Sequence, residues 1–146
     1  MEHHKWESTF FPVSIDFAKE YTDILNRGII YIHKRDKYMH PIFILNMKLL
    51  TESKLAPDTV INMTCYLIQF LIMRGMVPGK CENWVTIFDM KGVGVTNVPK
   101  KLMKSITKPL QTYFKGRLFR LYCINAKWII NMCWKIAKKV VDPLTI

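Results

Sequence analysis

The sequence predicts an α/β domain with a mixed, mostly parallel sheet flanked by helices. Two apolar runs rich in β-branched and aromatic residues, Trp84–Phe88 and Leu118–Ile124, lie about thirty residues apart with a helical pattern between them. That spacing is typical of a crossover connection between parallel strands that are buried on both faces. Two earlier apolar runs, joined by a polar turn, predict an antiparallel hairpin. Together these patterns favour one layered domain with a single core.

The first half of the chain predicts a helix followed by the hairpin. Ser14 suits an N-cap, residues 15–27 have helical apolar spacing, and Gly28 suits a left-handed stop. The strands are expected at 29–33 and 42–45, with a polar turn at 34–40 and Pro41 opening the second strand. Residues 48–56 are interpreted as a linker.

The second half predicts three further helices around the two later strands. Pro57 suits a first helical turn, and residues 58–74 are apolar almost all round, which is typical of a helix that is central in the core or flanks an apolar cavity. A helix is expected from Lys100 to about Phe114, kinked near Pro109. The last helix is expected at about 126–140.

Composition bounds the class of protein. The chain has 146 residues, half of them hydrophobic, which fits one folded domain rather than a disordered chain. No signal peptide is visible, and the most apolar segment, 60–73, is shorter than the roughly 20 residues that span a bilayer. The four cysteines form no CxxC and no zinc-ligand spacing, which favours reduced, buried thiols in a reducing compartment.

The net charge of +11 is concentrated in the last part of the chain. Residues 1–90 carry 10 Lys and Arg against 10 Asp and Glu, whereas residues 91–146 carry 12 against one acid, Asp142. A field of one sign attracts polyanions such as anionic lipid surfaces, nucleic acid or acidic proteins, although it also serves as a solubilising face.

Five short motifs occur in order over residues 29–146: Asp36–Phe43, Ile87–Gly92, Tyr113–Arg117, Tyr122–Ala126 and 134–143. This ordered set resembles the CRAL-TRIO lipid-binding domain family, which includes phosphatidylinositol/phosphatidylcholine transfer proteins. The family's counterparts are, in turn, a turn of Asp, Gly, Arg and Pro before the second strand, "Asp-Leu-Lys-Gly", "Tyr-Pro-Glu-Arg", "Ile-Ile-Asn-Ala-Pro" and "Lys-Pro-Phe-Leu-Asp-Pro". The resemblance implies a non-enzymatic protein that binds or transfers a phospholipid or other long-chain lipid without a cofactor.

The departures from the family pattern carry expectations of their own. Lys115 and Gly116 stand where the family has Pro and Glu, and that Glu helps to hold an inositol headgroup in some members. Residues 1–28 are interpreted as a helical lead-in and 29–146 as an incomplete domain that ends before the family's last strand and gating helix. An uncovered sheet edge and apolar cleft predict self-association of the chain as a homodimer.

Two sets of candidate binding residues follow from the resemblance and the charge pattern. The lipid pocket is expected to be lined by the sheet and by the helices at 58–74 and 126–140, at Met63, Leu67, Phe70, Ile87, Ile124, Ile130, Cys133, Trp134 and Ala137. Without the resemblance, each of these residues is interpreted simply as core; with it, pocket and core are equally good interpretations. A basic stripe at Lys100, Lys101, Lys104 and Lys108 is the predicted contact with an anionic membrane.

The residues argue against the other classes of function. The histidines are not accompanied by a nucleophile motif, no metal-ligand cluster is visible, and Gly92 and Gly94 read as a turn rather than a phosphate loop. Aromatic residues follow apolar periods instead of alternating with Arg, which argues against nucleic acid. The predicted function is lipid binding or transfer at anionic membranes, with a cytoplasmic, peripheral location; the alternative is an interaction scaffold that has the same fold and no open pocket.

Overall fold

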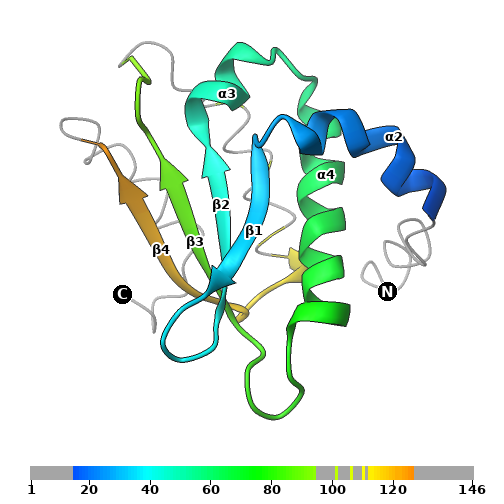
Figure 1. Ribbon diagram of the computed structural model, residues 1–146, viewed down its shortest axis with the longest axis vertical. Coiled ribbons are helices and arrows are strands. Elements are labelled where there is room, and N and C mark those ends of the chain that lie inside the picture. The colour runs from blue at the N-terminus through cyan, green and yellow to red at the C-terminus, as the bar shows by residue number, and fades with distance from the viewer. Residues whose placement is uncertain (1–14, 95–100, 102–105, 107–109, 111, 127–146) are drawn as a thin grey trace.

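A computed structural model describes residues 15–94, 101, 106, 110 and 112–126, and Figure 1 shows how the elements are arranged. The chain begins with helix α2 (Ile15–Asn26), followed by strands β1 (Ile30–Arg35) and β2 (Pro41–Asn46). Two helices follow, α3 (Met47–Glu52) and α4 (Pro57–Phe70), and α4 continues into a π-helical turn, η1 (Leu71–Gly75). The remaining strands are β3 (Trp84–Asp89) and β4 (Leu118–Ile124).

The four strands form one mixed sheet in the order β1-β2-β3-β4. β1 and β2 are antiparallel, whereas β2, β3 and β4 are parallel. The predicted hairpin and the predicted parallel crossover unit are therefore both confirmed. The expected strand at 118–124 has the same bounds as β4.

Local sequence explains most of the element boundaries. Gly28 has φ +68°, so it ends α2 in the left-handed conformation that a residue without Cβ adopts at little cost. Pro57 occupies the first turn of α4, where a missing N–H does no harm. Both features match the expectation from sequence.

The segment expected to be a linker contains a helix instead. Asn46, the last residue of β2, caps α3 by accepting a hydrogen bond from the Leu49 N–H at 3.1 Å. Met47 and Leu50 then bury their side chains in the core. The linker interpretation was therefore wrong for 48–52. A capped helix as short as this one is stabilised mainly by the burial of its apolar side chains in the core.

Helix α4 is less uniformly buried than its composition suggested. Val60, Met63 and Ile68 are almost fully buried, whereas Phe70 is 50% exposed and Met73, in η1, is 62% exposed. The helix does contribute to the core, as one of the two interpretations of its apolar composition requires, but its burial does not extend all round. The helix packs one side on the sheet and presents apolar residues to solvent at its carboxyl end.

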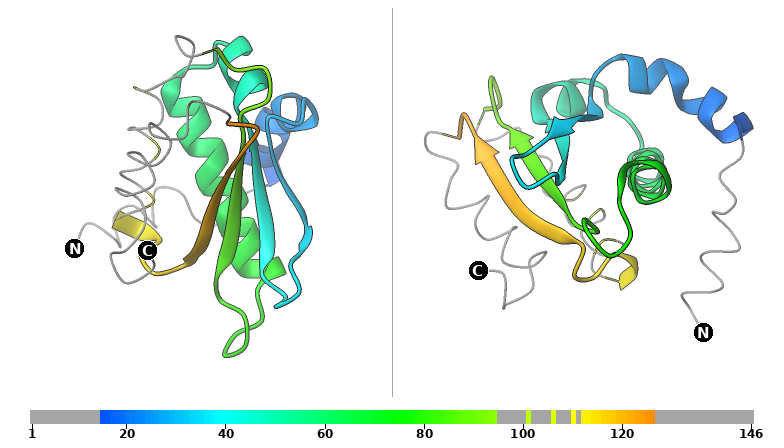
Figure 2. Two further views of the ribbon diagram at one scale, coloured as in Figure 1. Left: turned by 90° about the vertical axis from the view of Figure 1, so that its left-hand side faces the viewer. Right: turned by 60° about the horizontal axis from the view of Figure 1, so that its bottom comes forward.

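Helix α4 covers one face of the sheet (Figure 2), and the core lies on this face, which we call the core face. Its side chains include Ile30, Phe43 and Leu45 from the hairpin, packed with Val60 and the rest of the buried face of α4. Ile106 and Phe114, from the connection between β3 and β4, belong to the same core. Since crossovers between neighbouring parallel strands are right-handed, both connections lie on this one face.

The opposite face of the sheet, which we call the open face, is covered by no described helix, as Figures 1 and 2 show. Along β4, Arg120, Tyr122 and Ile124 are exposed on this face. Burial of the strands on both faces, expected from their apolar composition, was therefore wrong for β4 within the described residues. The predicted helix at 126–140 lies outside them except for Ala126.

The described cysteines are free thiols. Cys65 and Cys81 are buried and Cys123 is half-buried, while Cys133 lies outside the described residues. Burial raises the pKa of the Cys65 thiol to about 12, so this side chain stays protonated in the core.

Candidate functional site

The open face carries a continuous row of large side chains that crosses all four strands. Strand register aligns Tyr31 with Ile44, Ile44 with Ile87, and Ile87 with Tyr122. Residues aligned in this way project from the same side of a sheet. Tyr31 and Tyr122 are 39% and 44% exposed, and the two isoleucines between them are partly exposed. The result is an apolar strip that runs across the strands.

Shorter rows extend the apolar strip on either side. Ile42 and Val85 are aligned next to it toward the start of the parallel strands, and Arg120 completes that row. Ile124 lies toward the carboxyl ends, aligned with Asp89, and is 44% exposed. Val85 is buried and Ile42 is partly buried, so the exposed apolar side chains of this face are Tyr31, Tyr122 and Ile124. Exposed apolar side chains that adjoin one another are a mark of a binding surface.

Polar groups border the strip at both ends of β4. Arg120 Nη1 donates a hydrogen bond to the Tyr122 hydroxyl at 3.3 Å, and this contact raises the pKa of Arg120. Arg120 is therefore a fixed cation beside the strip. At the other end, Asn125 Nδ2 donates to Asp89 Oδ1 at 2.7 Å, and the Lys91 N–H donates to the same oxygen at 3.0 Å.

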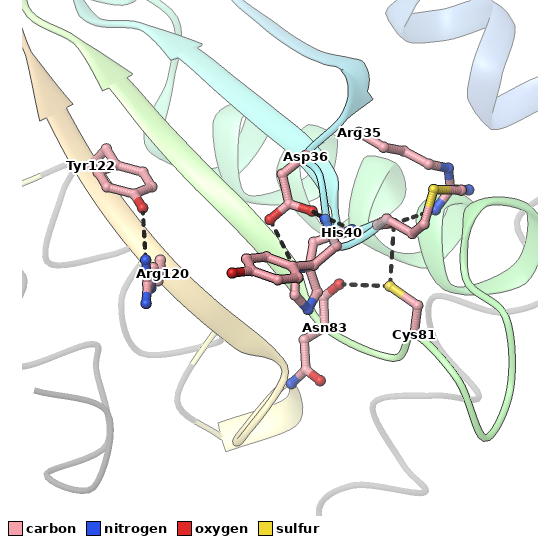
Figure 3. Close-up of polar contacts among 9 residues, drawn as sticks. Arg35, Asp36, His40, Cys81, Asn83, Arg120 and Tyr122 are labelled. Atoms are coloured by element: carbon pink, nitrogen blue, oxygen red, sulfur yellow. Dashed lines mark hydrogen bonds and ion pairs between the residues drawn. The ribbon is translucent and has the colours of Figure 1, made fainter.

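The start of the parallel strands is held by a network around Asp36 and His40 (Figure 3). Asp36 Oδ1 accepts hydrogen bonds from the backbone N–H groups of Tyr38 at 2.9 Å and His40 at 2.8 Å. Asp36 Oδ2 lies 2.9 Å from His40 Nδ1. The His40 ring stacks on Phe119 with centroids 4.2 Å apart, which joins the hairpin turn to the start of β4.

These contacts set the acidity of Asp36. Partial burial raises the pKa of the carboxyl group, but hydrogen bonds from the His40 ring and from the two backbone N–H groups outweigh it, so the net pKa is lowered. A lowered folded-state pKa stabilises the protein above the unfolded pKa, and that contribution is lost as the pH falls through the folded value.

We therefore expect Asp36→Asn to destabilise the protein at neutral pH and to do so progressively less as the pH falls below about 4. Thermal unfolding of wild type and variant at pH 7, 5 and 3 measures this difference. Asp23→Asn, which removes an exposed carboxylate from α2, controls for the loss of one negative charge. An equal difference between wild type and Asp36→Asn at all three pH values would contradict this account of the turn.

The structure divides the predicted pocket residues between the two faces of the sheet. Ile87 and Ile124 lie on the open face. Met63 is 0% exposed in the core, Leu67 packs against that core, and Phe70 is exposed at the end of α4. The described members of the predicted set therefore do not line one common surface. Ile130, Cys133, Trp134 and Ala137 lie outside the described residues.

The predicted basic stripe is largely outside the described residues. Lys101 is described and exposed, while Lys100, Lys104 and Lys108 are not described. The stripe remains a prediction for membrane contact.

Sequence reasoning missed the residues that complete the open face, namely Tyr31, Ile44 and Tyr122. The alternation in 118–124, where Arg120, Tyr122 and Ile124 share one side, contained a usable signal. In the described part of the chain no three His, Cys, Asp or Glu side chains are grouped to hold a metal. Nor does any described helix have the length and apolar character needed to cross a bilayer.

A mixed, mostly parallel sheet with helices packed on its core face defines the class of fold, an α/β domain. The chain belongs to the CRAL/TRIO domain family, whose model matches residues 25–146. The resemblance found in the motifs is thereby confirmed. Members of this family generally bind or transfer lipids and are typically not enzymes.

Curated relatives agree with this assignment at low identity. The SEC14 cytosolic factor of Yarrowia lipolytica is 26% identical over 97% of this chain, and the Sec14 cytosolic factor of Schizosaccharomyces pombe is 23% identical over 80%. The chain spans 32% of the first protein and 45% of the second. It therefore corresponds to less than half of the length of either relative.

A solved structure, that of Sfh5, has the same fold. Its TM-score is 0.67 at 17% identity, and the match covers 82% of this chain and 45% of that one. The predicted fold class is confirmed by this match, which at such identity concerns the fold alone.

Proposed function

We propose that this chain is a non-enzymatic module that holds a long-chain lipid, such as a phospholipid, against the open face and acts at anionic membrane surfaces in the cytoplasm. The observation that carries the proposal is the strip formed by Tyr31, Ile44, Ile87 and Tyr122. Such a strip is apolar, partly exposed and free of described helices, whereas a sheet of this composition ordinarily buries both faces.

The size of the strip suits an acyl chain. Four strands spaced about 4.8 Å apart give a surface roughly 14 Å wide, which accommodates a substantial part of a fatty-acid tail. Each methylene removed from water contributes about 0.8 kcal/mol, so ten methylenes supply about 8 kcal/mol, equivalent to micromolar binding before ordering costs. A tail can therefore be held without a dedicated headgroup site.

Charge beside the strip supports a phospholipid over a neutral lipid. Arg120 is exposed next to Tyr122 and presents a guanidinium group, which matches the geometry of phosphate oxygens. The sequence does not offer the family's inositol-binding Glu, because Gly116 occupies that place. We therefore propose a phosphate contact that does not select inositol.

Native mass spectrometry of the purified chain, followed by organic extraction, tests the proposal. We expect one phospholipid per chain, with a headgroup that is not restricted to inositol. A bare monomer that takes up no lipid from vesicles would overturn the proposal. A bare dimer would indicate that protein covers the open face, and would support the alternative function of an interaction scaffold.

A further inference from the structure

Exposed apolar side chains are concentrated at the end of the sheet where the parallel strands begin. Among the described residues, eight large hydrophobic side chains are exposed, and three of these belong to the open face. The other five are Tyr38, Met39, Phe70, Met73 and Val77. Met73, Tyr38 and Met39 are the most exposed of all, at 62%, 60% and 58%. This end therefore presents apolar tips that the open face does not account for.

These tips come from separate segments that hydrogen bonds hold together. Arg35 Nη1 donates to the Met39 carbonyl at 2.8 Å, and Arg35 Nη2 donates to the Gly75 carbonyl, so one side chain joins the hairpin turn to η1. Cys81 Sγ also donates to the Met39 carbonyl at 3.3 Å, and Cys81 forms a bridge with Val77. Figure 3 shows the contacts that Arg35 and Cys81 make with the Met39 carbonyl, and Figure 1 shows the hairpin turn and the loop after α4 at the bottom of the molecule.

Cations surround the apolar tips. Lys37 lies over the Tyr38 ring at 4.9 Å, Arg74 follows Met73, and Lys80 lies in the turn after Val77. Asn83 donates a hydrogen bond to the Gly116 carbonyl, which joins the turn before β4 to this end of the sheet. That turn adds the exposed Lys115 to the cations.

The acids at this end are already engaged. Asp36 is bonded to His40, and Glu82 Oε1 accepts a hydrogen bond from the Gly79 N–H at 2.9 Å. These two acids are outnumbered by Lys37, Arg74, Lys80 and Lys115, so the exposed charge around the tips is mainly positive.

We propose that Tyr38, Met39, Phe70, Met73 and Val77, together with Lys37, Arg74 and Lys80, form a docking surface for an anionic lipid bilayer. Apolar side chains flanked by cations match the surface of one leaflet of such a membrane. The apolar side chains enter the boundary of the acyl region, while the cations meet the anionic headgroups. Nucleic acid would use the cations but gain little from flexible methionine tips, since unpaired bases stack on flat rings.

This surface rests on the proposed function and deepens it, because it specifies how the open face would meet a membrane. Arg120 borders the open face at this same end of β4, and its guanidinium lies 5.1 Å from the Phe119 ring, which stacks on His40 of the hairpin turn. A lipid leaving the strip in this direction would reach the docked bilayer directly. The surface contains none of the residues of the predicted basic stripe at 100–108.

Two triple variants test the docking surface by co-sedimentation with vesicles of phosphatidylcholine alone or mixed with phosphatidylserine. Lys37→Gln with Arg74→Gln and Lys80→Gln should weaken binding to the anionic vesicles by roughly 100-fold. Tyr38→Ser with Met39→Asn and Met73→Ser should weaken it by roughly tenfold or more. Asn suits position 39 because the backbone there has φ +71°.

The matched control is Lys48→Gln with Lys54→Gln and Lys91→Gln, which removes the same charge from exposed sites near the other end of the strands. We expect this control to retain binding within about threefold. Equal loss in the control would show that only net charge matters, and full binding by both docking variants would show that the membrane contact lies elsewhere. Either result overturns the proposal, provided that circular dichroism shows folded variants.

Two further readouts separate this inference from the proposed function. Extracted lipid per chain should be the same in the docking variants and in wild type, because the open face is untouched. If the wild-type protein carries no lipid but binds anionic vesicles through these residues, the proposed function is contradicted and the docking surface is supported. A third outcome would identify a general polyanion site instead of a membrane contact. In that outcome the Lys37, Arg74 and Lys80 triple variant loses binding to a DNA duplex, and the Tyr38, Met39 and Met73 triple variant binds vesicles as wild type does.

Discussion

An Ile87→Asp variant is expected to lose bound lipid by a factor of 100 or more while remaining folded. Ile87 lies at the centre of the strip, between Ile44 and Tyr122 in register, and its side chain is partly exposed. In the free protein the carboxylate keeps contact with water, so its cost to stability is limited. A bound acyl chain would cover that carboxylate without a hydrogen-bonding partner, which costs several kcal/mol. The ratio of extracted lipid to protein measures the effect.

The conservative variant Ile87→Leu is the matched control, because it retains volume and apolar character. We expect it to carry lipid at the level of wild type. Thermal unfolding of both variants establishes that the domain is intact. Undiminished lipid in a folded Ile87→Asp variant would mean that the ligand lies somewhere other than the open face.

The order of the elements could be predicted from sequence because the signals are local. The run Leu118–Ile124 is bounded by Gly116 and Asn125, and both have positive φ in the structure, at +76° and +57°. The Asp36–Pro41 turn likewise separates two apolar runs that pair as a hairpin. Helix α3 could not be predicted in this way, because its capping residue, Asn46, is also the last residue of a strand.

The candidate site was only partly predictable, because it depends on strand register. Ile87 and Ile124 were predicted as pocket residues from the family resemblance, but their neighbours Ile44 and Tyr31 are brought beside them by pairing between strands distant in sequence. Whether an apolar residue faces the core or the open face changes with a one-residue shift in that pairing. The resemblance therefore grouped Met63 with Ile87, although the sheet separates them.

The assignment of Met63 to the core predicts a large loss of stability when its side chain is truncated. Met63 is 0% exposed on α4 and belongs to the cluster that includes Phe43, Ile68 and Trp84. Met63→Ala should lower the free energy of unfolding by about 2–5 kcal/mol, because the cavity left behind is only partly filled by its neighbours. Urea unfolding followed by circular dichroism measures this change.

Phe70→Ala supplies the control on the same helix, because Phe70 is 50% exposed and its truncation should change the free energy of unfolding by about 0.5 kcal/mol or less. Lipid content separates the two roles that the sequence leaves open for Met63. A core residue changes stability while the lipid carried per folded chain stays constant, whereas a pocket residue changes lipid content first. Loss of lipid from Met63→Ala at nearly unchanged stability would move the binding site from the open face to the side of the sheet covered by α4.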